Sequence, residues 1–166
     1  MISVQKLSPN DWQQYRDIRL MALKDDPHAF GSSYEEEVGQ TEFDWQSRIG
    51  AMWFALDGED VVGLIGLLQG ENQSSKHCGY VISTWVKPQF RGKGIAKAMH
   101  KKLQDVAPSL GLRKLSLQVT VTKTAAFGLY QDLGFKTVGL LKNNLLKDGQ
   151  YFDEYLMEWV DSALIS

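Results

Sequence analysis

The chain has 166 residues, of which 43% are hydrophobic and 23% are charged, and its formal net charge is −2 at pH 7. This length is enough for one domain with a continuous core, and the composition is typical of a folded globular protein rather than a disordered one. The balance of 18 Lys and Arg residues against 20 Asp and Glu residues argues against a protein that mainly grips nucleic acid by its phosphates.

The chain has one cysteine, Cys78. A single thiol cannot form an internal disulfide, and cysteine-based zinc sites need several, so we expect no metal and a reducing, cytoplasmic compartment. Residues 1–6 lack the basic region and apolar stretch of a signal peptide. The longest apolar run, Val61 to Leu68, is too short to cross a bilayer as a helix and is typical of a buried strand. We therefore expect no membrane association.

One strand and two helices are expected in the first third of the chain. Residues 4–7 suggest the strand, and a helix follows the turn at residues 9–11 and ends before Pro27. Residues 29–37 are expected to be irregular, and residues 42–49 form a second, short helix. The first helix carries an apolar stripe at helical spacing: Trp12, Tyr15, Ile18 and Ala22.

Three strands and a helix are expected in the middle of the chain. Residues 52–56 and 61–69 are strands joined by a tight turn, and a third strand over residues 78–86 follows a polar loop. Pro88 ends that strand, and a glycine-bearing turn then opens a helix. The core stripe of this helix is Ile95, Met99, Leu103 and Val106.

The last third is expected to contain three strands and one helix. Residues 114–121 alternate as a strand, and Thr122 caps a helix that runs to Leu133, where Gly134 stops it. Residues 135–141 and 151–160 form a final pair of strands. Helices and strands mix throughout without a linker or repeat, which predicts a single domain over residues 1–166 of the α+β (mixed α/β) class.

The segment from Val86 to Ala96 links a strand to a helix and is suited to bind an anion. A helix N-terminus presents free backbone N–H groups and a partial positive charge. Gly92 and Gly94 leave room for a phosphate to approach the backbone, and Arg91, Lys93 and Lys97 add positive charge. The alternative is a glycine turn with solvated basic side chains.

Two well-known phosphate loops are excluded. A P-loop needs a Gly-Lys-Ser/Thr sequence, but here Gly94 follows Lys93. A dinucleotide-binding fingerprint needs a third glycine, and that position is occupied by Lys97.

Two motifs of this chain resemble those of the GNAT superfamily of N-acetyltransferases. The sequence from Gln89 to Gly94 fits the family pattern Gln/Arg-x-x-Gly-x-Gly/Ala. The sequence from Thr124 to Phe135 resembles the family's Asn-x-x-Ala-x-x-Leu-Tyr-x-x-x-Gly-Phe helix and strand, with Lys123 where the family usually has asparagine. The resemblance implies a mixed, mostly antiparallel sheet of about six to seven strands flanked by about four helices.

The resemblance also implies acetyl-CoA as co-substrate. The loop amides would hold its pyrophosphate, and the strand before the loop would pair with its pantetheine arm. The residues implied in cofactor binding are Trp85, Val86, Gln89, Arg91, Gly92, Lys93, Gly94, Ile95, Ala96, Lys123, Ala126 and Phe127.

Tyr130 is the candidate catalytic residue. A phenol, whose ordinary pKa of about 10 keeps it protonated at neutral pH, suits the role of proton donor to the departing thiolate. The alternative is a core tyrosine whose ring only packs. No covalent enzyme intermediate is required, and we expect Cys78 to be a small core residue and the three histidines to have no catalytic role: His28, His77 and His100.

The general base is left open. Many relatives have a glutamate on the strand before the glycine loop, but here Ile82, Ser83 and Thr84 occupy that place. A chain of water molecules is one alternative, and one of Glu35, Glu36 and Glu37 is another, although these three residues also fit a solvated charge run.

The leading hypothesis is an N-acetyltransferase that moves an acetyl group from acetyl-CoA to a primary amine of a small molecule or peptide. The rival is a non-catalytic acyl-CoA-binding or protein-interaction domain with the same fold. The identity of the amine is open, and so is a homodimer formed through the last strands.

Overall fold

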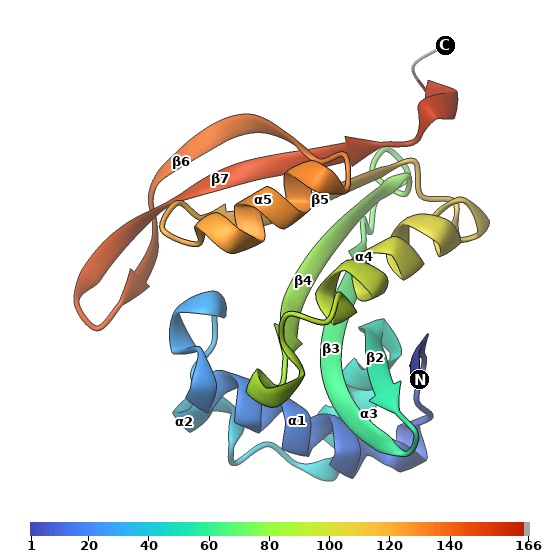
Figure 1. Ribbon diagram of the computed structural model, residues 1–166, viewed down its shortest axis with the longest axis vertical. Helices are drawn as coiled ribbons and strands as arrows, with labels where there is room; N and C mark the ends of the chain where they lie inside the picture. The colour runs from blue at the N-terminus through green and yellow to red at the C-terminus, as the bar shows by residue number, and fades with distance from the viewer. Residues whose placement is uncertain (165–166) are drawn as a thin grey trace. The chain divides into compact units, whose positions relative to one another are not determined.

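The computed structural model describes residues 1–164. Over that range it contains five α-helices and a seven-stranded sheet with the hydrogen-bonded order β1-β2-β3-β4-β5-β7-β6. Pairing is antiparallel between β1 and β2, β2 and β3, β5 and β7, and β6 and β7, and parallel between β4 and β5. The mixed, mostly antiparallel sheet predicted from the sequence is thus confirmed (Figure 1).

The strands are β1 (Ile2–Gln5), β2 (Met52–Asp57), β3 (Asp60–Gln69), β4 (Cys78–Val86), β5 (Lys114–Thr120), β6 (Lys136–Lys147) and β7 (Gln150–Val160). The helices are α1 (Trp12–Asp25), α2 (Tyr34–Glu37), α3 (Glu42–Arg48), α4 (Ile95–Val106) and α5 (Thr124–Asp132).

The described residues divide into two compact units. The first contains residues 1–67 and 82–102, and the second contains residues 68–81 and 103–164. The strand β4 and the helix α4 each contribute residues to both units. The single domain expected from the sequence stays a prediction.

The core of the first unit joins the apolar stripe of α1 to α3 and β2. Tyr15 is 2% exposed, and its ring makes edge-to-face contacts with Trp45 of α3 at 5.2 Å and with Phe54 of β2 at 5.8 Å between ring centroids. Ile18 and Ala22 lie on the same stripe and are buried. Burial of this face is what holds α1 in place, because aromatic rings remove large apolar areas from water.

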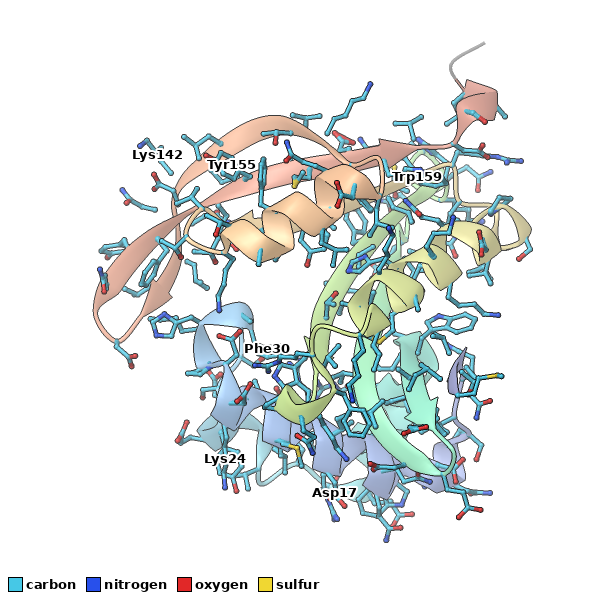
Figure 2. All side chains as sticks on the ribbon, viewed as in Figure 1. Asp17, Lys24, Phe30, Lys142, Tyr155 and Trp159 are labelled. Carbon is cyan, nitrogen blue, oxygen red and sulfur yellow. The ribbon has the colours of Figure 1, made fainter. Side chains whose placement is uncertain are left out.

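The second unit is built on β5 and the long hairpin of β6 and β7 (Figure 1). β5 pairs with β7 from Lys114 opposite Val160 to Thr120 opposite Glu154. Leu115 and Met157 are fully buried within this pair. The hairpin itself carries polar and aromatic side chains such as Lys142 and Tyr155 (Figure 2).

Three expected boundaries were wrong, and one is the end of β6, which runs to Lys147 rather than to residue 141. β1 ends at Gln5, so Leu7 lies outside it. Thr122 does not cap α5: the Lys123 N–H donates to the Thr120 carbonyl at 2.9 Å, and this turn delays the helix, whose N-cap is Lys123.

The segment expected to be irregular contains the short helix α2. Ser33 and Glu36 form a capping box, with the Ser33 N–H donating to Glu36 Oε2 at 2.7 Å and the Glu36 N–H donating to Ser33 Oγ at 3.3 Å. The reciprocal bonds satisfy two donors at the helix start, which explains why one turn forms here.

Candidate active site

The loop between β4 and α4 has the geometry of an anion site. Gly92 and Gly94 adopt φ values of +75° and +78°, a left-handed region that side chains with a Cβ rarely adopt. A Cβ built on either glycine would meet no atom within 4 Å, so the space next to the backbone is open. The residues present therefore fit a pyrophosphate that approaches the main chain closely.

The helix α4 supplies the donors. It is 12 residues long and begins at Ile95, and the Ala98 N–H already donates to the Gly94 carbonyl at 3.0 Å. The N–H groups of the residues before Ala98 lie in the first turn of the helix. Such groups have no hydrogen-bond partners within a helix, and this end of a helix carries a partial positive charge. Ile95 is 3% exposed and anchors this end of the helix in the core.

The other predicted loop residues differ in exposure. Gln89 and Lys93 are exposed, Ala96 is half-buried, and Trp85 and Val86 at the end of β4 are buried. The Arg91 N–H donates to the Pro88 carbonyl at 3.2 Å, so this amide is already bonded within the loop.

The Arg91 side chain is held by the protein itself. Its Nε donates to the Val86 carbonyl at 2.9 Å, and its second terminal nitrogen donates to Asp25 Oδ2 at 2.5 Å. The Trp85 indole Nε1 donates to the same carboxylate oxygen at 2.9 Å. Asp25, the last residue of α1, therefore links the end of β4 to the glycine loop. The sequence showed Asp25 only as a helix end and did not indicate this link.

A buried charge network lies where the sequence showed a run of three glutamates. Glu35 and Glu36 are exposed, as expected of a solvated run, but Glu37 is 2% exposed. Arg19 donates to Glu37 Oε2 from Nε at 3.0 Å and from a terminal nitrogen at 2.8 Å, and Arg48 donates to Oε1 at 2.6 Å. The expectation of a solvated run was wrong for Glu37, because two arginines neutralise it in the core.

His100 of α4 contacts β4. Its Nε2 lies 3.2 Å from Thr84 Oγ1, and the residue is 1% exposed. Burial lowers the pKa of His100 to about 4, so the ring is neutral at pH 7. The neutral, buried ring thus packs α4 against β4.

Tyr130 lies on α5 in the second unit and is 9% exposed. Its ring makes an edge-to-face contact with Phe135 at 6.1 Å, and its carbonyl accepts from the Phe135 N–H at 3.0 Å. Gly134, with φ +90°, ends the helix so that this bond can form, as the sequence predicted.

The predicted neighbours of Tyr130 on α5 are half-buried. Phe127 packs against Tyr155 of β7 with 5.1 Å between ring centroids, while Ala126 and the N-cap residue Lys123 keep part of their surface exposed. Because residues three and four apart share a helix face, Ala126, Phe127 and Tyr130 lie on one side of α5.

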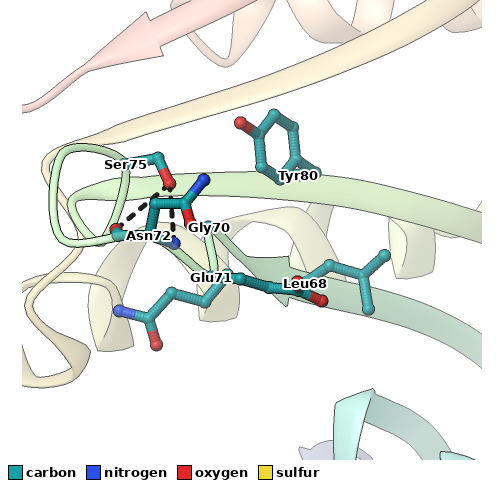
Figure 3. A pocket seen from close by; sticks show the side chains of 7 residues that line it. Leu68, Gly70, Glu71, Asn72, Ser75 and Tyr80 are labelled. Carbon is teal, nitrogen blue, oxygen red and sulfur yellow. Dashed lines mark hydrogen bonds between the residues drawn. The ribbon is translucent and has the colours of Figure 1, made fainter.

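A separate hollow lies in the second unit beside the loop that follows β3 (Figure 3). Ser75 stabilises the loop, because its hydroxyl hydrogen-bonds to the Asn72 main chain. Gly70 allows the close approach of the Ser75 carbonyl, since a Cβ on Gly70 would lie 2.2 Å from it. None of the predicted site residues lines it; the lining residues are Leu68, Gln69, Gly70, Glu71, Asn72, Ser75 and Tyr80.

The order of the sheet, the glycine loop at the start of α4 and the tyrosine-bearing helix after β5 define the class of GNAT-type acetyltransferases. The chain belongs to that family: residues 12–135 match the model of the acetyltransferase (GNAT) family.

Curated relatives agree with this assignment. N-acetyltransferase 8B of Homo sapiens is 31% identical over 134 residues, which cover 80% of this chain and 53% of that protein. N-acetylaspartate synthetase of Xenopus tropicalis is 32% identical over 94 residues, covering 57% of this chain and 34% of that protein. The chain thus spans about half or less of the length of these relatives.

Solved structures share the fold. A GNAT-family acetyltransferase from Streptococcus pneumoniae superposes with a TM-score of 0.84 at 18% identity, covering 98% of this chain and 100% of the other. An acetyltransferase from Salmonella typhimurium, solved with its cofactor acetyl-CoA, superposes with a TM-score of 0.81 at 16% identity, covering 96% and 94%. In residues 1–164, no helix combines the length and the apolar character that crossing a membrane requires.

Proposed function

We propose that this protein transfers an acetyl group from acetyl-CoA to a primary amine by direct attack, without a covalent enzyme intermediate. The observation that carries the proposal is the pair of left-handed glycines, Gly92 and Gly94, with open space beside them at the start of a 12-residue helix. Membership of the acetyltransferase (GNAT) family supports it.

The glycine loop before α4 would bind the cofactor's phosphates. The amides from Gly92 to Ala96 would donate to the pyrophosphate, and the exposed side chains of Gln89 and Lys93 would add polar and charged contacts. The backbone of Trp85 and Val86 would pair with the pantetheine arm, and a backbone N–H there would stabilise the oxyanion that forms at the thioester carbon.

Tyr130 of α5 would supply the proton donor. The amine nitrogen attacks the thioester carbon, the carbon–sulfur bond breaks, and Tyr130 donates its proton to the departing sulfur. The phenolate then regains a proton from water. Lys123, Ala126 and Phe127 are the other residues of this segment that we propose for cofactor binding.

The geometry supports water rather than a glutamate as the base that takes the amine's proton. Glu37 is neutralised by two arginines, and Glu36 is engaged in a capping box. Glu35 is exposed on α2, and we propose no role for it as the base.

The acceptor is proposed only as a class. The relatives are named N-acetyltransferase and N-acetylaspartate synthetase, which supports a nitrogen acceptor. Because the chain spans only part of these relatives, their own substrates are not assigned to it. The cytoplasmic location and a homodimer stay predictions from the sequence.

Release of free thiol from acetyl-CoA tests the proposal, measured with a panel of small amines, polyamines, amino acids and peptides. We expect thiol release with at least one amine and micromolar to millimolar coenzyme A binding by calorimetry. Binding without transfer to any amine would favour the rival reading, a non-catalytic acyl-CoA-binding domain. The departure from the family pattern at Lys123 is the feature that favours that rival.

A further inference from the structure

Ser83 has an unusual backbone for a strand residue. It lies within β4 and adopts φ +59°, in the left-handed region. Among the described residues, two other non-glycine residues have positive φ, Asn143 and Asp148, and both are of types that tolerate this region. Serine is not among the residue types that tolerate the left-handed region, so we expect a contact from another residue to stabilise this backbone conformation of Ser83.

Arg19 makes the contact that stabilises this backbone conformation. Its NH1 nitrogen donates to Ser83 Oγ at 2.8 Å across 64 residues of sequence. Its other nitrogens, Nε and NH2, both bind Glu37, so the guanidinium cannot rotate away from Ser83 without breaking an ion pair. The ring of Phe30 lies 4.7 Å from the guanidinium carbon and covers it; Figure 2 labels this residue.

The network is buried and is held from its far side as well. Arg19 is 6% exposed and Glu37 is 2% exposed, and Arg48 binds the second oxygen of Glu37. Buried ion pairs are weak sources of stability, since desolvation of the charges opposes their attraction. The network instead fixes the orientation of the Arg19 side chain. Two hydrogen bonds to Glu37 hold the planar guanidinium so that its NH1 group points at the Ser83 hydroxyl.

The residues that follow Ser83 depend on its backbone. Thr84 Oγ1 contacts His100 at 3.2 Å, and Trp85 Nε1 binds Asp25 at 2.9 Å. Two glycines of β3 also accommodate this stretch: a Cβ on Gly66 would lie 2.7 Å from Ile82 Cγ1, and one on Gly63 would lie 3.1 Å from the Trp85 carbonyl. If φ of Ser83 changed sign, the direction of the backbone from Thr84 to Val86 would change with it.

We infer that Arg19 is a positioning residue: fixed by Glu37, it holds the left-handed backbone of Ser83 and so aims the backbone groups of Trp85 and Val86 at the thioester. The inference rests on the proposed function for what those groups face. It does not rest on that function for the backbone geometry itself.

Ser83→Ala and Ser83→Gly form the matched pair that tests the inference. Both lack the hydroxyl, but glycine adopts positive φ at no cost, whereas alanine does not. We expect Ser83→Ala to lower kcat about tenfold, in line with the penalty of the left-handed region for a residue with a Cβ, and Ser83→Gly to stay within about threefold of wild type. Backbone chemical shifts of residues 83–86 should change in the alanine variant and not in the glycine variant.

Arg19 is tested by the double change Arg19→Gln with Glu37→Gln, which removes both buried charges together. It should lower kcat as Ser83→Ala does, and it should cost little more when added to Ser83→Gly, because the two act on one backbone feature. Urea unfolding of each variant identifies those that are folded, and rates are compared among these alone.

Three results would overturn the inference. Equal losses in Ser83→Ala and Ser83→Gly would mean that the hydroxyl itself meets the reacting groups. Unchanged turnover in both variants would mean that the backbone of Ser83 does not matter to the reaction. Wild-type shifts at residues 83–86 in Ser83→Ala would mean that the hydroxyl does not hold the backbone. If the wild-type protein transfers no acetyl group, the proposed function fails, and the chemical shifts still decide whether Arg19 holds Ser83.

Discussion

Arg91 and Asp25, which are 66 residues apart in sequence, form an ion pair of 2.5 Å that ties the glycine loop to the end of α1. Since the same carboxylate oxygen also accepts from the Trp85 indole, one side chain braces both the loop and the strand before it. The Arg91 side chain therefore stabilises the loop through protein contacts, and we propose that the backbone amides after it bind the anion.

Arg91→Gln and Asp25→Asn should therefore weaken coenzyme A binding by similar factors. We expect about two- to fivefold in each case, the size of a partly exposed ion pair, and little further loss in the double variant. Calorimetry with coenzyme A measures the effect. Arg113→Gln is the control, because Arg113 forms a comparable 2.8 Å pair with Asp161 in the second unit. A much larger loss for Arg91→Gln alone would mean that the guanidinium binds the pyrophosphate directly.

Gly92→Val and Gly94→Val should each weaken coenzyme A binding about tenfold or more. A branched side chain would strain the left-handed backbone and fill the open space that the anion needs. Gly58→Val is a matched control: Gly58 has φ +63° and open space beside it, but it lies in the turn between β2 and β3. Unchanged affinity in both loop variants, measured by calorimetry, would rule out this placement of the pyrophosphate.

Tyr130→Phe should lower kcat about a hundredfold while changing acetyl-CoA affinity little. The ring keeps its contact with Phe135, so packing is retained and the proton donor alone is lost. Tyr151→Phe, at a residue that is 61% exposed, serves as the control and should keep full turnover. Turnover of the Tyr130 variant within about twofold of wild type in a thiol-release assay would refute the acid role.

At limiting amine, activity should rise with pH toward the amine's own pKa, because the enzyme uses the fraction of amine that is already neutral. Glu35→Gln and Glu36→Gln should show the same profile as wild type, since glutamine at position 36 still completes the capping box with Ser33.

A lower turnover at every pH in either variant, with a changed profile, would identify that glutamate as the base. A higher Michaelis constant with lost salt sensitivity would instead show that the carboxylate attracts a cationic amine. Glu37 is left out of this comparison because removing its charge leaves the buried Arg19 without its carboxylate partner, which typically costs about 3–5 kcal/mol of stability.

His100 should make the protein less stable in acid. Its pKa is lowered to about 4 in the folded state from an ordinary 6.5, so the unfolded chain binds the extra proton first. The contribution of the neutral ring to the free energy of unfolding is fully present above about pH 6.5. It is lost as the pH falls toward 4, and the total loss is on the order of 3 kcal/mol. Urea unfolding between pH 7 and pH 4 measures the slope. His100→Gln, which keeps a partner for Thr84, should flatten it; an unchanged slope would contradict the assignment.

The secondary-structure elements and the glycine-bearing turn before α4 could be predicted from the sequence because local rules govern them. Alternation of apolar residues indicates the strands, the stripe of Ile95, Met99 and Leu103 indicates α4, and Gly134 indicates the end of α5. The order of the two motifs was enough to predict the family and the mixed sheet.

The contacts that brace the site were decided by tertiary structure alone. In the sequence, Arg19 lies next to Ile18 at helical spacing, but no adjacent residue indicates its bond to Ser83. Glu37 follows two exposed glutamates, and its position in the sequence does not indicate that it is buried. Asp25 and Arg91 likewise belong to separate elements. Burial of a charged side chain requires a partner, which the fold brings from elsewhere in the chain. The sequence around either residue contains no pattern that identifies its partner.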